Sequence, residues 1–241
     1  MVYIRVVGLL ILLTLSEFLF AKNSRQIVLS EDDTTAVDSI PFKFFSGAEL
    51  YLDYGKVLTL LTKFESKYEG GINLRFYGRF VLAGEFGYAV LNPLKAYDNA
   101  LSYTITGNYF RAGIDYYINL DKKNALYGGL RYGSSHFSDE GEFLLESDFW
   151  EDYGESFGSD NLNADWFEII FGSETRMNIG KSVKEENPRG GLFLGWKARL
   201  RILWHFENRE EPRVYAIPGY GRTFDKSIPA LNLYIKYRFG R

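Results

Sequence analysis

The sequence predicts an all-β protein, an eight-stranded antiparallel up-and-down transmembrane β-barrel. The composition is unusually aromatic (17%) and includes 24 glycines, although the mean hydropathy is only -0.18. Apolar and polar side chains alternate in eight segments, which is typical of strands with two unlike faces. Beyond residue 21 no stretch is apolar for long enough to form a membrane-spanning helix. A mature chain that spans a membrane must therefore do so as a closed sheet.

Composition and charge exclude several classes of protein. The chain has no cysteine, which excludes a disulfide scaffold, a thiolate site and a lipid-anchored cysteine. Its formal net charge of -3 lacks the basic excess of a nucleic-acid-binding protein. The high apolar content also argues against disorder.

The N-terminus predicts export from the cytoplasm. A basic start that includes Arg5 precedes an apolar run at 6–15, and Ala21 offers a small residue for cleavage. We interpret residues 1–21 as a cleaved signal peptide, with a membrane anchor as the alternative. Residues 22–41 are predicted to be a flexible leader, and residues 42–239 the barrel.

Eight alternating segments supply the predicted strands. They lie at 42–54, 68–76, 79–88, 101–118, 126–132, 167–177, 194–202 and 231–239. A tight turn is expected at Tyr77–Gly78. In the fourth segment the apolar phase changes near Gly107–Asn108, which we interpret as a β-bulge.

Alternation does not reveal which face meets the medium, because a soluble lipocalin-like barrel turns its apolar face inward. Three features favour an outer-membrane barrel. The links after the second, fourth and sixth segments are expected to be shorter than the other links. Aromatic residues gather near strand ends, and Tyr237 and Phe239 resemble the C-terminal signal read by the barrel assembly machinery, although Gly240 and Arg241 follow. We therefore expect an outer-membrane protein of a Gram-negative cell envelope.

The polar face predicts a charged lumen. Its members are Glu49, Glu69, Arg75, Glu85, Arg111, Asp115, Arg131, Glu168, Glu174, Arg176, Lys197, Arg199, Arg201, Lys236 and Arg238. An eight-stranded barrel is just wide enough for its own side chains. We therefore favour a packed, salt-bridged interior over a small ion-conducting pore. Inward glycines, such as Gly87 and Gly133, are expected to make room for the long arginine side chains.

Residues 138–163 form a predicted acidic outer loop without lysine or arginine. Its acids are Asp139, Glu140, Glu142, Glu146, Asp148, Glu151, Asp152, Glu155 and Asp160. A solvated loop is the favoured interpretation, and capture of divalent cations is the alternative. No calcium-loop spacing is present, so no resident metal is predicted. A second outer loop is expected at 204–229, and both are expected to meet lipopolysaccharide or a partner protein.

Catalytic residues are hard to find in this sequence. His136 and Ser138 are two residues apart, so they share a strand face, and Glu140 or Glu142 could orient the histidine. The pair resembles the His-x-Ser of lipid A deacylases, but an ordinary polar strand end is the favoured interpretation. The glycine-rich string at 217–221 lacks a following lysine, so we interpret it as a turn and not as a phosphate loop.

Four strings carry a resemblance to a known family: GNYFRAGIDY at 107–116, LRYG at 130–133, ADWFE at 164–168 and IPGYG at 217–221. They resemble an uncharacterised outer-membrane β-barrel family of Bacteroidetes-type bacteria, catalogued as a domain of unknown function. The resemblance implies a fold and a location, and it brings no catalytic residues. The predicted function is that of a small, monomeric, non-enzymatic outer-membrane barrel without cofactor, which contacts lipopolysaccharide or an envelope partner.

Overall fold

The computed structural model describes residues 44–57, 65–93, 100–121, 123–145, 153–177, 190–206 and 212–239. The predicted signal peptide and leader lie outside the described residues. The elements are β1 (Phe45–Asp53), α2 (Tyr54–Val57), β2 (Glu65–Phe76), β3 (Phe80–Leu91), β4 (Ala100–Asn119), β5 (Asn124–Leu145), β6 (Tyr153–Arg176), β7 (Gly191–His205), β8 (Ala216–Ile217), β9 (Gly221–Arg222) and β10 (Ser227–Phe239). In the described part of the chain no helix is long and apolar enough to cross a membrane.

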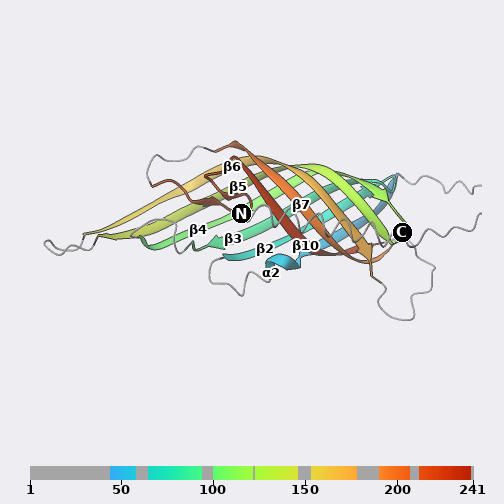
Figure 1. Cartoon of the computed structure of the whole chain (residues 1–241), viewed down its shortest axis with the longest axis horizontal. Helices are drawn as coiled ribbons and strands as arrows, with labels where there is room; N and C mark the ends of the chain where they lie inside the picture. Colours follow the sequence, from blue (N-terminus) through green and yellow to red (C-terminus); the bar gives the residue numbers. More distant parts are fainter. Residues whose placement is uncertain are drawn as a thin grey trace, which may run out of the picture. The chain divides into compact units, whose positions relative to one another are not determined.

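Eight strands form an antiparallel sheet that closes into a ring, as the sequence predicted (Figure 1). Each strand pairs with its neighbours in the chain, and β10 closes the ring by pairing with β1. Closure gives every strand a partner on both sides along its shared length, so few backbone groups are left without a hydrogen bond. The alternation of β-branched, aromatic and charged side chains then sends one set outward and the other inward.

The two ends of the ring differ. At the turn end, Tyr77 and Gly78 both have positive φ and form the predicted tight turn between β2 and β3, with the Arg79 amide donating to the Phe76 carbonyl at 3.1 Å. The next hairpin link joins Asn119 of β4 to Asn124 of β5, and the Leu120 amide donates to the Asn124 carbonyl at 3.0 Å. The predicted alternation of link lengths is wrong, however. The link 177–190 at the turn end is longer than the links 54–64, 92–99 and 146–152 at the opposite, loop end.

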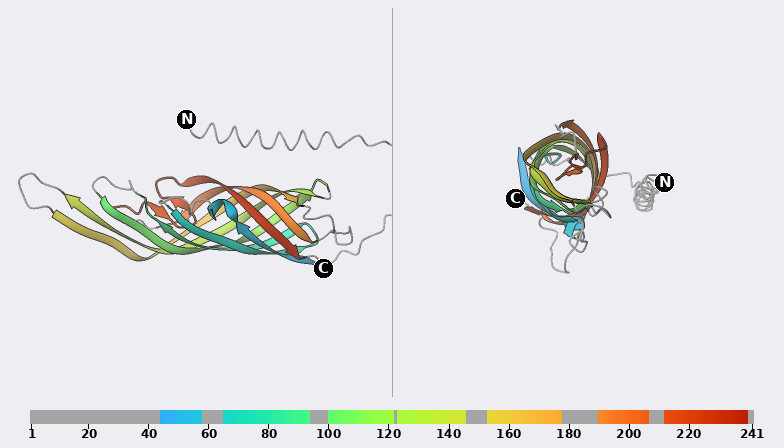
Figure 2. Two further views of the ribbon diagram at one scale, coloured as in Figure 1. Left: turned by 90° about the horizontal axis from the view of Figure 1, so that it is seen from below. Right: turned by 90° about the vertical axis from the view of Figure 1, so that its left-hand side faces the viewer.

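Two strands are much longer than predicted at the loop end, and a third, β7, is three residues longer. β5 continues to Leu145 and β6 begins at Tyr153, so most of the expected acidic loop 138–163 is a hairpin of paired strands. β7 ends at His205, opposite Asp165 of β6. The β5–β6 hairpin therefore reaches beyond the rest of the ring (Figure 2, left).

The bulge expected near Gly107 is also wrong. β4 pairs continuously with β3 and β5 through Gly107 and Asn108 without a change of register. Tyr103 and Ile105 point inward on the same parity as Arg111 and are buried. Near Gly107 the interior changes in character. Its side chains are apolar toward the loop end and charged toward the turn end.

The wall is staggered because β1 is short. β1 pairs with β10 only from Tyr234 onward and with β2 only from Gly70 onward. In the described residues, Ser227–Leu233 of β10 and residues 65–69 of β2 therefore have no strand partner on the side where each strand meets β1. The single turn of α2 contacts both strands here.

Candidate functional site

The interior of the ring contains many buried charged side chains. Its buried acids are Glu49, Asp53, Glu69, Glu85, Asp115, Asp139, Glu168 and Glu174. Its buried cations are Lys67, Arg75, Arg111, Arg131, Lys197, Arg199, Arg201 and Lys236. The two sets are equal in number, so the buried charges of the described residues balance. Of the predicted lumen residues, only Arg176 and Arg238 are partly exposed.

Toward the loop end, two arginines hold three glutamates together. Arg111 places Nη1 2.9 Å from Glu69 and 3.1 Å from Glu85, and Nε 2.8 Å from Glu168. Arg199 contacts the same three carboxylates, at 2.7 Å to Glu85, 2.7 Å to Glu168 and 3.4 Å to Glu69. Each carboxylate is thus shared by two guanidinium groups that come from opposite sides of the ring. We call these five residues the loop-end cluster.

Two further cations extend the loop-end cluster. Lys197 donates to Glu85 at 2.8 Å. Arg131 makes a two-pronged contact with Asp115, at 2.7 and 2.6 Å. Such bidentate pairs fix the guanidinium plane as well as its position.

A separate cluster lies at the turn end. Glu49 is contacted by Arg75 at 2.9 Å, Lys236 at 2.9 Å and Arg238 at 2.6 Å. Glu174 accepts hydrogen bonds from Arg238 at 2.8 Å and from Lys236. Arg75 also donates to the Gly78 carbonyl at 3.1 Å, which ties this turn-end cluster to the hairpin turn.

Four tyrosines separate the two clusters. Tyr117 and Tyr127 stack with their ring centroids 4.7 Å apart, and Tyr51 and Tyr234 meet edge to face at 6.1 Å. The Tyr117 ring lies 4.1 Å from the Arg75 guanidinium of the turn-end cluster. The Tyr51 ring lies 4.6 Å from Lys197 Nζ of the loop-end side. Aromatic rings thus fill the cross-section between the charged layers.

The predicted outer loop 204–229 does not stay outside the ring. Its strands β8 and β9 form a hairpin inside the ring (Figure 2, right), and Val214, Ile217 and Tyr220 are fully buried. Residues 218–220 make the predicted turn, and the Tyr220 amide donates to the Ile217 carbonyl at 3.1 Å. We call residues 214–223 the plug hairpin. Sequence reasoning missed its insertion, although the run of small and apolar residues at 214–220 was a usable signal.

Hydrogen bonds join the plug hairpin to the loop-end cluster. Arg111 donates to the Gly219 carbonyl at 2.9 Å, and Arg201 to the Tyr220 carbonyl at 2.6 Å. Above them, an apolar group that includes Ile105, Phe137 and Trp166 covers the charged layer. The loop end is therefore closed by packed side chains and by the plug hairpin.

Four of the predicted inward glycines make room for aromatic rings, and not for arginines as predicted. A Cβ atom on Gly87 would lie 2.1 Å from the Tyr109 ring, and one on Gly133 would lie 2.3 Å from the Trp166 ring. Gly71 and Gly195 face Tyr51 and Tyr234 in the same way. Each ring lies against a glycine of a neighbouring strand, so closely that a Cβ atom on the glycine would force the ring to move.

The outer wall carries the complementary, apolar set of side chains. Along β4, Phe110, Ile114, Ile118 and Leu120 are exposed. An aromatic row at the loop end joins Phe110, Tyr132, Phe167 and Trp204 across four strands, with successive centroids 6.3, 5.8 and 5.5 Å apart. A second row at the turn end includes Phe44, Phe76, Tyr77, Phe80 and Tyr116.

The catalytic candidates lie on this outer wall, just beyond the loop-end aromatic row. His136 is exposed, and its Nδ1 atom lies 2.9 Å from the side-chain oxygen of Asn163. Within the described residues, neither Ser138 nor Glu140 is hydrogen-bonded to His136. Glu142 is exposed two residues further along the strand. The structure thus places an amide, and no carboxylate, against the histidine ring.

The acids of segment 138–163 that the structure describes do not converge on one site. Asp139 is buried and accepts hydrogen bonds from the Tyr103 hydroxyl at 2.7 Å and the Ser159 amide at 3.0 Å. Glu140, Glu142, Glu155 and Asp160 are exposed. Glu146, Asp148, Glu151 and Asp152 lie outside the described residues. Across the described ranges no group of three or more acids or histidines is arranged to hold a metal ion.

The two residues of the predicted assembly signal lie on the outer face of β10. Tyr237 and Phe239 are each about half exposed, and their rings meet edge to face at 4.9 Å.

Comparison with known proteins gives a family for the chain. The family model described as Domain of unknown function (DUF6048) matches residues 3–239. The chain belongs to this family. No curated protein matches it. The sequence resemblance to a domain of unknown function is thereby confirmed, and the DUF6048 assignment itself carries no activity.

The four strings singled out in this DUF6048 chain meet at one level of the ring. Arg111 from the first string contacts Glu168 from the third and Gly219 from the fourth. Trp166 lies over Gly133 of the second string, and its ring lies 5.9 Å from that of Tyr220. Trp166 also donates to Glu168 at 2.8 Å. The strings thus build the boundary between the plug hairpin and the loop-end cluster.

Proposed function

We propose that this DUF6048 protein is a small, non-enzymatic β-barrel of the outer membrane of a Gram-negative bacterium, with a structural or surface-interaction role. The observation that carries the proposal is the outer wall. Most of its large exposed side chains are apolar, among them the two aromatic rows and, between these rows, Ile114, Leu130 and Ile169. A soluble protein rarely exposes so large an apolar surface, whereas a lipid-facing wall requires one.

The dimensions of the apolar band support the same proposal. Along β4 and the residue that follows it, the band runs from Phe110 to Leu120. Thr106 and Asn108 lie beyond one end of the band, and Asp121 and Lys123 beyond the other. Ten residue steps of about 3.3 Å, at a strand tilt of about 40°, give roughly 25 Å. This is about the height of the apolar band of known outer-membrane barrels.

The filled interior supports a protein that conducts no ions. Arg111, Tyr109, Tyr117 and Trp166 are among the largest fully buried side chains of the described residues, and all point into the ring. A water-filled pore instead needs a lumen wide enough to keep its charged groups hydrated. The interior is therefore best explained as a stabilising ion-pair core.

The loop end is the side that we propose to face the cell exterior. There the β5–β6 hairpin extends beyond the aromatic row and carries exposed acids, while Arg213, Arg222 and Lys226 are exposed near the plug hairpin. These surfaces are the proposed contacts with lipopolysaccharide or an envelope partner. Tyr237 and Phe239 are the proposed signal to the assembly machinery, and we propose a monomer.

Membrane fractionation combined with gel migration tests this proposal. The protein should sediment with the outer membrane, resist extraction with carbonate or urea, and migrate differently before and after boiling. A water-soluble protein would leave the pellet, and that result would overturn the proposal. Planar-bilayer recording is the companion measurement, in which reproducible single-channel steps would contradict the non-conducting interior.

A further inference from the structure

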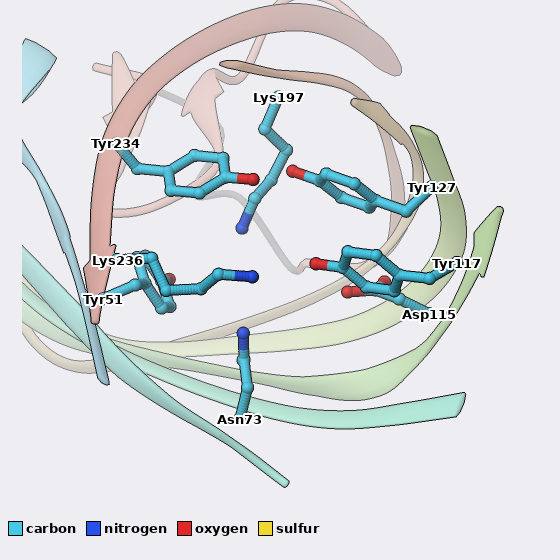
Figure 3. Close-up of a pocket in the computed structure, with 8 residues that line it drawn as sticks. All are labelled: Tyr51, Asn73, Asp115, Tyr117, Tyr127, Lys197, Tyr234 and Lys236. Atoms are coloured by element: carbon cyan, nitrogen blue, oxygen red, sulfur yellow. The ribbon is translucent and has the colours of Figure 1, made fainter. Parts of the chain in front are cut away.

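A small void lies within the group of four tyrosines, between the two charged clusters. Its volume is about 10 Å³, and its lining includes Tyr51, Asn73, Lys197 and Lys236. Figure 3 shows the ammonium groups of both lysines and the side-chain amide of Asn73 pointing toward the same space. The void thus lies where polar groups from β1, β2, β7 and β10 converge.

Two of the residues that line this void carry a buried polar atom with no hydrogen-bond partner among the described residues. These atoms are the hydroxyl oxygen of Tyr51 and the side-chain oxygen of Asn73. Both residues are only 7% exposed. Nearly all buried polar groups in proteins are hydrogen-bonded, so two such atoms beside one void point to a bound molecule.

The orientation of the Asn73 amide is fixed by its neighbour. Its nitrogen donates to Glu49 at 3.3 Å. Rotating the amide by half a turn would set its oxygen against the Glu49 carboxylate, which is an acceptor only. The amide oxygen therefore needs a donor from the void.

The size of the void and the charges around it indicate which molecule or ion it holds. A site of roughly 10–15 Å³ holds one water molecule. Lys197 and Lys236 would repel a metal cation. A halide would leave the amide oxygen of Asn73 without a donor, and the buried charges already balance. A water molecule can donate to the Asn73 oxygen and also accept from the lysine ammonium groups, because it accepts two hydrogen bonds and donates two.

We propose that one structural water occupies this void. It donates to the side-chain oxygen of Asn73 and to the Tyr51 hydroxyl, and it accepts from the lysine ammonium groups, each of which has three N–H donors. Lys197 also pairs with Glu85 and Lys236 with Glu49. The water therefore links the loop-end cluster to the turn-end cluster. This inference concerns the interior alone and stands whether or not the outer wall faces lipid.

Crystallography tests the proposal directly. In crystals of the purified protein in detergent, we expect one density peak within hydrogen-bond distance of Asn73 Oδ1 and the Tyr51 hydroxyl. Crystals soaked in sodium bromide should give no anomalous peak there. A dry void, or a bromide peak at this position, would overturn the proposal.

Thermal unfolding gives an independent test, because the unfolding midpoint of a Tyr51→Phe variant should shift in opposite directions for a hydrated and a dry void. If the water is present, Tyr51→Phe removes a hydrogen bond and should lower the unfolding midpoint by about 2–4 °C. If the void is dry, the same change removes an unsatisfied hydroxyl and raises the midpoint. Tyr117→Phe is the matched control, because its hydroxyl already donates to Glu174 at 3.4 Å and its loss is destabilising in both cases.

Discussion

Arg111 donates a hydrogen bond to the carbonyl oxygen of Gly219 at 2.9 Å, although 108 residues separate the two. The same guanidinium group contacts Glu69, Glu85 and Glu168. One buried side chain therefore neutralises acids from three strands and holds the plug hairpin in place. Together with Arg201, which donates to the Tyr220 carbonyl at 2.6 Å, Arg111 ties the plug hairpin to the ring.

Replacing Arg111 with methionine should cost about 3–5 kcal/mol of unfolding free energy. The change keeps most of the side-chain volume but leaves buried carboxylates with one guanidinium group too few. Urea unfolding followed by tryptophan fluorescence measures the loss. Arg222→Gln, an exposed change on the plug hairpin, is the control and should stay within about 0.5 kcal/mol. Equal effects of the two variants would contradict the ion-pair core.

Gly87→Ala should destabilise the protein by about 1–3 kcal/mol, because the added methyl group overlaps the Tyr109 ring. That ring cannot shift freely, since its hydroxyl donates to Glu69 at 2.6 Å. Gly84→Ala lies three residues away on the outer face of β3, where the nearest atom is 3.9 Å from the new Cβ. Its unfolding midpoint should match that of the wild type, and a comparable loss there would refute the role given to the inward glycines.

The turn between β4 and β5 should depend on pH through Asp121. Burial is the largest single influence on this carboxyl and raises its pKa. Hydrogen bonds from the backbone amides of Lys123 and Asn124, at 2.6 and 2.7 Å, and from the Asn124 side chain at 2.8 Å together outweigh burial and lower the pKa. A lowered folded-state pKa stabilises the fold above the unfolded-state pKa of about 3.9, and this stabilisation is lost as the pH falls through the folded-state value.

Asp121→Ala should therefore lower the unfolding midpoint at pH 7, by the equivalent of about 1 kcal/mol. The difference from the wild type should shrink when both proteins are melted at pH 3 and below. A difference that stays constant with pH would show that the charged carboxylate is not what stabilises the turn.

His136→Ala should leave lipid A acylation unchanged. The histidine faces Asn163 at 2.9 Å and lacks an orienting acid among the described residues. Mass spectrometry of lipid A from cells with the wild-type protein, the variant or no protein provides the measurement. An acylation pattern that changes with the protein and reverts with the variant would instead support a deacylase.

The alternation of side chains was enough to predict eight strands and the inward charges, because period-2 patterning is local. Arg131 and Glu168, for example, are both buried as expected from parity. What the pattern could not separate is an apolar side chain that faces lipid from one that faces an apolar interior. The pattern alone therefore gives Tyr103 and Ile105 the same lipid-facing role as Phe110, which has the opposite parity, and only a bulge near Gly107 would reconcile them; in the structure both are buried in the interior.

The plug hairpin escaped prediction for a different reason. Its place in the ring depends on hydrogen bonds between its carbonyl groups and Arg111 and Arg201, which are distant in sequence. The ion-pair partners were equally inaccessible, since they depend on which strands face each other across the ring. The predicted strands were also too short. Polar outward residues such as Asn108 and His136 belong to strands that continue beyond the apolar band, where the apolar alternation stops.

The most direct test of the proposed membrane location is to place a charge on the outer wall. Ile114 is 59% exposed and lies in the middle of the apolar band on β4. Ile114→Arg should cost about 2–4 kcal/mol of unfolding free energy for protein folded into lipid vesicles, because the guanidinium would face hydrocarbon. Asn108→Arg, on the same face of the same strand but beyond the aromatic row, should cost about 0–1 kcal/mol. If Ile114→Arg is instead as neutral as Asn108→Arg, the outer wall faces water and the proposed membrane-spanning barrel is wrong.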